Sequence, residues 1–275
     1  MIEIVRAGPL TTVQDQGRPG YAHLGVPRSG ALDAPAARLA NRLVGNPSSA
    51  AVLETTLMGC ALRFTEPAVV AVTGAPAEVA VDGARLAGVL EVPAGGVVQV
   101  GRATAGVRSY LAVAGGISVE PVLGSRSTDT LSGLGPPRLT DGATLPVGTP
   151  YRDPAWAAHL LPLPPSEPVL GVRLGPRADW VDVSALFRRS WTLTPVSNRV
   201  GARLAGPALP RRRDGELPPE GVVLGAIQVP ADGQPLIFLA DHPTTGGYPV
   251  IGVVDDVTPL AQARPGTTVR FRDLD

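Results

Sequence analysis

The side chains that could do chemistry gather in Gly-rich stretches, and the first such stretch covers residues 11–30. It contains Gln14, Asp15 and Arg18, and Ser29 follows eleven residues after Arg18. Glycine-rich loops bring backbone N–H groups close to a ligand. Glutamine and arginine can bind a planar carboxylate, carbamate or ureido group through paired hydrogen bonds. A capped surface loop in which Asp15 and Arg18 pair with each other explains these residues equally well.

Three further clusters are polar. Residues 124–129 (Gly-Ser-Arg-Ser-Thr-Asp) could bind an anion through hydroxyls and Arg126, or cap a helix. Residues 197–201 form the third cluster. Residues 240–249 form the fourth and follow an apolar run, so Asp, His, two Thr, two Gly and Tyr come directly after a predicted strand. This arrangement favours the rim of a binding site, and the alternative is a long β-turn.

Several kinds of catalytic site are not expected in this sequence. It has no G-x-S-x-G and no G-x-G-x-x-G motif, and His23, His159 and His242 lack metal-ligand spacing, so we expect no metal site. All 24 basic residues are arginine. The absence of lysine excludes a Schiff base, a P-loop lysine and a biotinyl-lysine on this chain. Cys60 lies in an apolar run, where we expect a buried hydrophobic side chain and no nucleophile.

The charge balance argues against a nucleic-acid or membrane partner. There are 24 acidic and 24 basic residues, and aromatic residues make up 4% of the chain. A nucleic-acid-binding protein would show a basic stripe and more stacking platforms. The basic run at residues 211–213 is followed by Asp214 and Glu216, which indicates a solvated loop. With no signal-peptide pattern and no long apolar stretch, we expect a cytoplasmic protein.

These clusters must be positioned by a fold that is mainly β with a few short helices. Hydrophobic residues make up 44% of the chain and charged residues 17%, and short apolar runs alternate with Gly and Pro. The predicted strands are residues 2–6, 51–56, 69–73, 78–81, 97–100, 108–113, 191–194, 226–229, 236–239, 250–254 and 268–271. One helix is predicted to begin after the N-cap Asp33 and to stop at residues 45–47. Residues 179–187 could form another short helix.

A weak internal repeat indicates two β units. Residues 2–9 resemble residues 169–176, and two further pairs of similar segments follow in the same order. Five prolines between positions 154 and 168 predict a stiff connection. We therefore expect an N-terminal domain at 1–150, a Pro-rich connection at 151–168 and a C-terminal domain at 169–275.

The clusters resemble the motifs of the biotin-dependent carboxyltransferase-like family. This family includes the C subunit of 5-oxoprolinase, also called KipA, and proteins called allophanate hydrolase subunit 2. The match runs from about Met1 to Phe271, and its motifs are residues 13–20, 25–33, 197–204, 225–235 and 240–249. The resemblance implies two tandem cyclophilin-like β-barrel domains. The allophanate hydrolase name finds no support in the residues, because an amidase Ser-Ser-Lys arrangement needs a lysine.

For function, the resemblance implies the C subunit of an ATP-dependent 5-oxoprolinase. Together with a directly bound, KipI-like B subunit and an A subunit, it would convert 5-oxo-L-proline to L-glutamate and would be inactive alone. ATP would then be needed at the level of the complex. One alternative is the carboxyltransferase component of a biotin-dependent carboxylase acting on urea or another amide, with biotin on another chain. A second alternative is a non-catalytic regulator that binds a KipI-like kinase inhibitor.

The motif match also suggests roles for individual residues. We expect Gln14, Asp15 and Arg18 to be catalytic and to orient the substrate carbonyl or carboxylate. The remaining expected site residues bind the lactam or amide substrate, and they are Ser29, Arg199, Gln234, Thr244, Thr245 and Tyr248.

Overall fold

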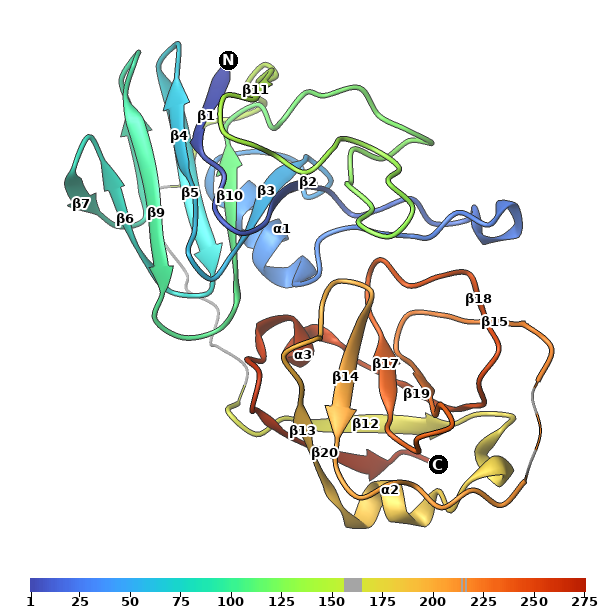
Figure 1. The fold of residues 1–275 in the computed structure, drawn as a ribbon. Helices are drawn as coiled ribbons and strands as arrows, with labels where there is room; N and C mark the ends of the chain where they lie inside the picture. Colours follow the sequence, from blue (N-terminus) through green and yellow to red (C-terminus); the bar gives the residue numbers. More distant parts are fainter. Residues whose placement is uncertain (156–164, 214, 216) are drawn as a thin grey trace. The chain divides into compact units, whose positions relative to one another are not determined.

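The computed structural model describes residues 1–155, 165–213, 215 and 217–275, and it divides into two compact units (Figure 1). The first unit holds Met1–Arg18 and Ser29–Leu163, and the second holds Pro19–Arg28 and Pro164–Asp275. Much of the predicted Pro-rich connection at 151–168 lies outside the described residues, as does His159. The predicted domain boundaries therefore stay a prediction, and each unit is described by itself.

The first unit is built from two mainly antiparallel sheets. The six-stranded sheet has the order β11(Thr144–Leu145), β1(Ile2–Arg6), β4(Ala61–Phe64), β9(Val97–Ala103), β6(Ala77–Val81) and β7(Ala84–Leu86). The five-stranded sheet has the order β2(Thr11–Gln14), β3(Val52–Thr56), β10(Arg108–Val113), β5(Ala68–Gly74) and β8(Val89–Val92). Alternation along each strand sends one set of side chains into a shared core. Its members include Ile2, Ile4, Leu62, Phe64, Val98 and Val100 from the first sheet and Val13, Leu53, Val70, Leu111 and Val113 from the second.

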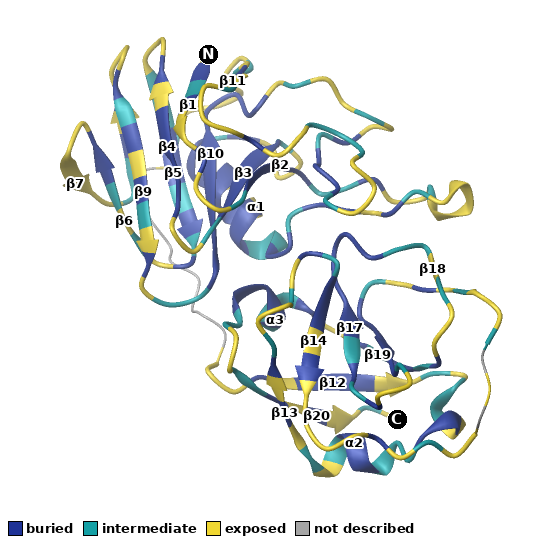
Figure 2. Ribbon diagram, viewed as in Figure 1, coloured by how far each residue is buried: buried dark blue, intermediate teal, exposed yellow. Residues whose placement is uncertain are grey.

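Helix α1(Ala34–Leu43) covers the other face of the five-stranded sheet. The Asp33 carboxylate accepts a hydrogen bond from the Ala36 N–H at 3.0 Å, and Pro35 lies in the first turn, so the predicted start of this helix is confirmed. Its apolar stripe, which includes Leu39 and Leu43, packs on strands β3, β5 and β10. Strand β10 is therefore buried on both faces along its whole length, as Figure 2 shows.

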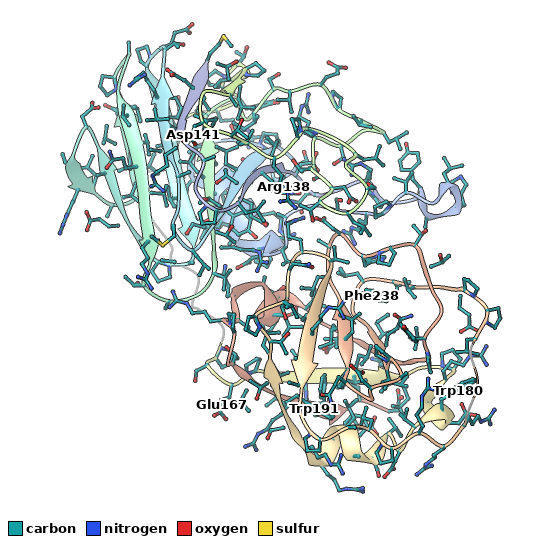
Figure 3. The ribbon with its side chains drawn as sticks, viewed as in Figure 1. Arg138, Asp141, Glu167, Trp180, Trp191 and Phe238 are labelled. Atoms are coloured by element: carbon teal, nitrogen blue, oxygen red, sulfur yellow. The ribbon has the colours of Figure 1, made fainter. Side chains whose placement is uncertain are left out.

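The second unit is a closed barrel, whose strand order is β12(Val169–Leu174), β19(Val250–Val254), β16(Ala226–Gln228), β17(Leu236–Phe238), β14(Gly201–Ala205), β13(Ser190–Leu193) and β20(Thr268–Asp273). Strands β12 and β20 run parallel where the barrel closes. Trp191 is 1% exposed, and its indole N–H donates to the Leu186 carbonyl at 3.3 Å (labelled in Figure 3). Gly206 lies against this ring, because a Cβ there would come within 2.7 Å of the indole.

Short elements complete the second unit. A 3-10 turn at Ala178–Trp180 and helix α2(Ser184–Arg188) occupy the predicted helical region 179–187 as two separate pieces. Helix α3(Thr258–Gln262) precedes the last strand. Strands β15(Glu220–Gly221) and β18(Thr245–Gly246) pair outside the barrel.

The mainly β class is confirmed, and the barrel is confirmed in one unit. In the first unit, the described strands are divided between two sheets and do not close into a single barrel. The repeated segments form β1 and β12, the first strand of each unit, but their neighbours differ. A local sequence echo fixes the strand and not the strands with which it pairs.

Candidate functional site

Four of the predicted site residues meet at one loop of the first unit, residues 122–129, which we call the 122–129 loop. Gln14 ends strand β2, and Asp15 and Arg18 follow it. Their side chains, and that of Ser29, all form hydrogen bonds with this loop. The first and second polar clusters of the sequence are therefore two halves of one buried arrangement.

Asp15 fastens the loop. Its Oδ1 accepts hydrogen bonds from the Ser125 and Ser127 hydroxyls, both at 2.6 Å, and from the Gly17 N–H at 2.8 Å. Its Oδ2 accepts from the Arg126 N–H at 2.6 Å. Hydrogen bonds to a carboxylate are among the stronger ones in proteins. With four donors and 7% exposure, the Asp15 carboxylate orders the loop in this conformation.

Gln14 and Arg18 are buried as well, at 0% and 1% exposure. The Gln14 amide Nε2 donates to the Thr12 hydroxyl at 3.1 Å and to the Thr128 carbonyl at 3.0 Å. Arg18 Nε donates to the Val122 carbonyl at 3.3 Å, and Nη2 donates to a carbonyl of the same loop. Among the described residues, Gln14 Oε1 and Thr128 Oγ1 have no hydrogen-bond partner. The unused hydrogen-bonding atom of the Gln14 amide is therefore its acceptor oxygen, and this atom is buried.

Ser29 closes the arrangement from the other side. It has a positive φ of 53°, and its hydroxyl donates to Asp129 Oδ2 at 2.9 Å. The second oxygen of Asp129 accepts from the Leu131 and Ser132 N–H groups, both at 2.8 Å. Asp129 thus stabilises a turn, and no helix begins there in the described part of the chain.

A second buried network holds the start of helix α1, and sequence reasoning did not find it. Glu54 Oε2 accepts from the Tyr110 hydroxyl at 2.7 Å and from the Leu32 N–H at 3.0 Å, while Arg108 lies 3.5 Å from Oε1. The Tyr110 oxygen accepts from the Asp33 N–H at 2.7 Å. Burial, followed by the nearby Glu54 and Asp33 carboxylates, raises the pKa of Tyr110 well above its ordinary value. The detectable signal was a glutamate inside the apolar run 51–56.

The second unit contains a buried ion pair. Arg199 Nε and Nη2 each donate to one oxygen of Asp241, both at 2.9 Å, and the side chains are 1% and 0% exposed. The Asp241 N–H also donates to the Arg199 carbonyl at 3.0 Å. The third and fourth polar clusters are thereby joined. In this arrangement, the Arg199 guanidinium faces a protein carboxylate, whereas the sequence analysis expected it to bind the lactam or amide substrate.

The remaining predicted site residues of the second unit differ in their exposure and in whether their side chains are hydrogen-bonded within the protein. Gln234 pairs with the backbone of Gly206, with bonds of 2.9 and 3.0 Å. In contrast, Thr245 and Tyr248 are exposed, and their hydroxyls have no hydrogen-bond partner within the described residues. Thr244 lies next to them and is half-buried, and its carbonyl accepts from the Val222 N–H. This segment can therefore meet a ligand without rearranging.

The side chain of Gln228 is hydrogen-bonded to this segment, and Gln228 was not among the predicted site residues. It is 3% exposed, and its amide donates to the Tyr248 carbonyl at 3.1 Å. Gly246 lies directly against the same amide, so a side chain at position 246 would displace it. A glutamine inside the apolar strand β16 was the available signal.

Within the described residues, three cavities have volumes of about 790, 310 and 210 Å³. Of the predicted site residues, Gln234 alone lines one of these three cavities, the smallest. The described residues hold no group of three or more His, Cys, Asp or Glu that could bind a metal ion. Among these residues, each helix is too short or too polar to span a bilayer.

Comparison with known proteins gives a consistent assignment. The model of the carboxyltransferase domain, subdomain A and B, matches residues 24–273. The chain is 41% identical to the C subunit of 5-oxoprolinase from Escherichia coli strain K12, over 98% of this chain and 90% of that protein. That relative's name makes it one subunit of a multi-subunit complex.

Solved structures agree with the sequence match. Urea amidolyase of K. lactis superposes with a TM-score of 0.90 at 33% identity and covers 100% of this chain. The protein TTHA0988 superposes with a TM-score of 0.89 at 37% identity over 98% of this chain. The chain spans 19% of the first of these chains and 55% of the second, so it is similar to one part of each. With the family model matched along nearly all its length, the chain belongs to the carboxyltransferase domain family of subdomains A and B.

Proposed function

We propose that this chain is the C subunit of an ATP-dependent 5-oxoprolinase in the cytoplasm. With A and B subunits, the complex would convert 5-oxo-L-proline, ATP and water to L-glutamate, ADP and phosphate. The observation that carries the proposal is the 41% identity to the C subunit of a 5-oxoprolinase, which extends over nearly the whole of both chains.

The geometry supports a division of roles among the predicted site residues. Asp15, Arg18 and Arg199 use their charged groups inside the protein, which makes them positioning residues in this conformation. Thr245 and Tyr248 present free hydroxyls at an exposed, glycine-containing segment. We therefore assign contact with the lactam, or with the partner protein that completes the site, to Thr244, Thr245 and Tyr248.

The composition supports an activity that depends on partners. Without lysine, the chain cannot hold biotin covalently, and it has no lysine to place against the phosphates of ATP. The chemistry that consumes ATP is therefore assigned to the assembled complex. This chain contributes loops that form one side of the site and are held in place by charge-assisted hydrogen bonds.

Reconstitution tests the proposal. The chain is co-purified with the A and B subunits of the same organism, and glutamate release from 5-oxoproline is measured with and without ATP. We expect ATP-dependent glutamate release that requires all three proteins. No turnover with all three present would overturn the proposal.

A variant pair tests the assignment of Tyr248 in the same assay. Tyr248 is 48% exposed, and Tyr248→Phe removes a hydroxyl that has no hydrogen-bond partner within the described residues. We expect kcat/KM to fall by about tenfold, the value of a hydrogen bond made in the complex. Tyr151→Phe is the matched control, because Tyr151 is 61% exposed in the other unit. Equal activity of both variants would remove Tyr248 from the site.

A second candidate is the carboxyltransferase component of a biotin-dependent carboxylase. The TM-score of 0.90 with K. lactis urea amidolyase favours it. Because this chain lacks lysine, biotin would have to be carried by another protein. Incorporation of labelled bicarbonate into urea, abolished by avidin, would select this candidate over 5-oxoproline hydrolysis.

A further inference from the structure

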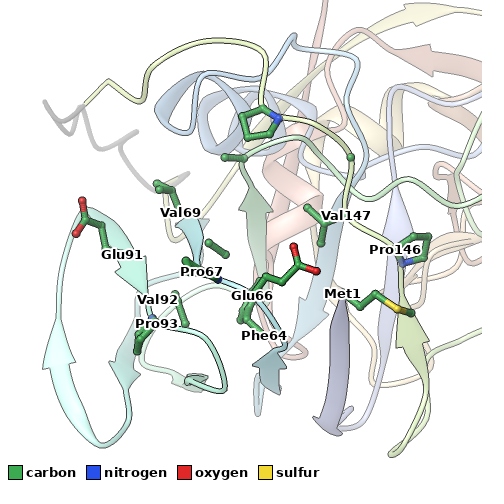
Figure 4. A pocket seen from close by; sticks show the side chains of 14 residues that line it. Met1, Phe64, Glu66, Pro67, Val69, Glu91, Val92, Pro93, Pro146 and Val147 are labelled. Atoms are coloured by element: carbon green, nitrogen blue, oxygen red, sulfur yellow. The ribbon is translucent and has the colours of Figure 1, made fainter.

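The cavity of about 790 Å³ lies in the first unit and shares no lining residue with the cluster around Asp15. It is lined by the start of β5, the end of β8 and residues 146–150 (Figure 4). Four of its lining residues are Pro67, Pro93, Pro146 and Pro150. Proline fixes its own backbone angle, so these walls are rigid and little conformational entropy is lost when a ligand binds them.

Two carboxylates stand over this apolar lining. Glu66 lies in the middle of the lining side chains in Figure 4, and Glu91 lies at one side. Both are exposed, and neither forms an ion pair or a hydrogen bond within the described residues. By contrast, Glu3 in the same unit pairs with Arg63 at 2.9 Å.

The charged side chains that line the cavity are both carboxylates. No basic side chain occurs among the described lining residues. The α-ammonium group of Met1, which also lines the cavity, is hydrogen-bonded to the Thr65 hydroxyl at 2.8 Å, and its one positive charge is outnumbered by the two carboxylates. An anionic ligand would be repelled here, and a neutral apolar ligand would desolvate carboxylates that stay unpaired. A cation with an apolar stem satisfies both parts of the lining, because it can bury its methylene groups and leave its charge beside the carboxylates.

The position of the cavity indicates a peptide segment. Strand β8 (Val89–Val92), which carries Glu91, is the outermost strand of the five-stranded sheet, and its only described partner strand is β5. The edge of β8 that faces away from β5 has no partner strand among the described residues, so it can hydrogen-bond an added extended chain. The volume of about 790 Å³ lies in the upper part of the range of about 300–1,000 Å³ for ligand sites, so a basic residue fits together with its neighbours.

We infer that this cavity and the β8 edge dock a segment of a partner protein that presents an arginine or lysine between apolar side chains. The carboxylates of Glu66 and Glu91 receive the cation, and the proline-rich lining receives the apolar neighbours. The inference concerns a surface separate from the site of the proposed function and does not depend on that function.

The test uses the full chain and the capped peptide acetyl-Ser-Leu-Arg-Leu-Ser-amide, with binding followed by calorimetry and by methyl NMR. We expect a Kd of about 1 mM or below, which is within reach of a short contact. The Val69 and Val147 methyl signals should shift, while those of Val223 in the other unit should not. Binding should weaken as salt is raised, because the carboxylates are exposed.

Two comparisons make the test decisive. The double variant Glu66→Gln/Glu91→Gln should raise the Kd about tenfold. It removes two exposed ion pairs with the peptide cation, and each such pair contributes up to about fivefold to affinity. Glu120→Gln is the matched control, because Glu120 is exposed, without a described partner and outside the cavity lining, and its Kd should not change. The peptide with glutamine in place of arginine should bind about tenfold more weakly. Equal affinity for both peptides, unchanged affinity of the double variant, or no binding at several millimolar would each overturn the inference.

Discussion

The ion pair between Arg199 and Asp241 offers a sharp test of how the second unit is held together. Both side chains are almost fully buried, and two parallel bonds of 2.9 Å join them. Arg199→Ala removes the cation and leaves the Asp241 carboxylate in the interior. Breaking a buried pair by deleting one partner costs about 3–5 kcal/mol, because the remaining charge stays in the interior without the opposite charge that stabilised it.

Urea denaturation measures this cost directly. Trp180 and Trp191 are both buried in the second unit, so tryptophan fluorescence can report its unfolding. With a denaturant slope of about 1.5–2 kcal/mol per M, a loss of 3–5 kcal/mol lowers the urea midpoint by about 2 M. Arg199→Lys should fall in between, since lysine keeps the charge but cannot make the paired bonds.

Arg203→Ala is the matched control on the neighbouring strand β14. Arg203 is exposed, so its removal should change the free energy of unfolding by about 0.5 kcal/mol or less. A midpoint for Arg199→Ala that equals that of Arg203→Ala would refute the reasoning. It would show that the pair contributes no more than an exposed side chain.

Three further predictions concern the first unit. Asp15→Asn should weaken the fastening of residues 125–127 by about 2 kcal/mol, so their amide hydrogen exchange should accelerate about 30-fold. Tyr110→Phe removes the hydroxyl that bridges Glu54 to the start of helix α1, and should lower the free energy of unfolding by about 2–3 kcal/mol in urea titrations followed by circular dichroism. Burial raises the pKa of the Cys60 thiol to about 11 from an ordinary value of 9.0, so this thiol should not react with a disulfide reagent at pH 8 until the protein unfolds. Above pH 9 the Cys60 thiol loses its proton in the unfolded chain but keeps it in the folded protein. About 2–3 kcal/mol of the free energy of unfolding should therefore be lost between pH 9 and 11. In Cys60→Ala, this decline should be smaller.

Each of these has a clear contrary result. Unchanged exchange in the Asp15 variant would mean that the loop is ordered without its carboxylate. A Tyr110→Phe protein as stable as the parent would mean that water replaces the hydroxyl. Rapid labelling of Cys60 in the folded protein would contradict its burial.

Much of the local structure could be predicted from the sequence. Strands β1 and β10 coincide with the predicted runs at 2–6 and 108–113, because β-branched and apolar residues bounded by glycine and proline favour short extended segments. Helix α1 begins after the predicted cap Asp33, because the interaction of a cap reaches only three residues along the chain. The division of the first unit into two sheets was not predictable in this way, because it depends on pairings between distant strands.

The candidate site shows the same limit more strongly. The sequence placed Gln14, Asp15 and Arg18 in a polar cluster, but the choice between ligand contact and internal pairing depends on what else reaches them. The Ser127 hydroxyl that binds Asp15 lies 112 residues further along the chain, and the carboxylate that binds Arg199 lies 42 residues further. Thr245 and Tyr248 are exposed, and Thr245 lies in β18, which pairs with β15 outside the barrel, a pairing that no local pattern indicates.

The sequence by itself determined the mainly β class, the capped helix, the absence of lysine chemistry and the membership of the family, because these follow from residue type and short-range spacing. Only the tertiary structure decided which polar groups pair with each other and which remain free. A buried charge must find a partner or remain desolvated without compensation, and that partner is fixed by the register of strands and the path of loops that are distant in sequence.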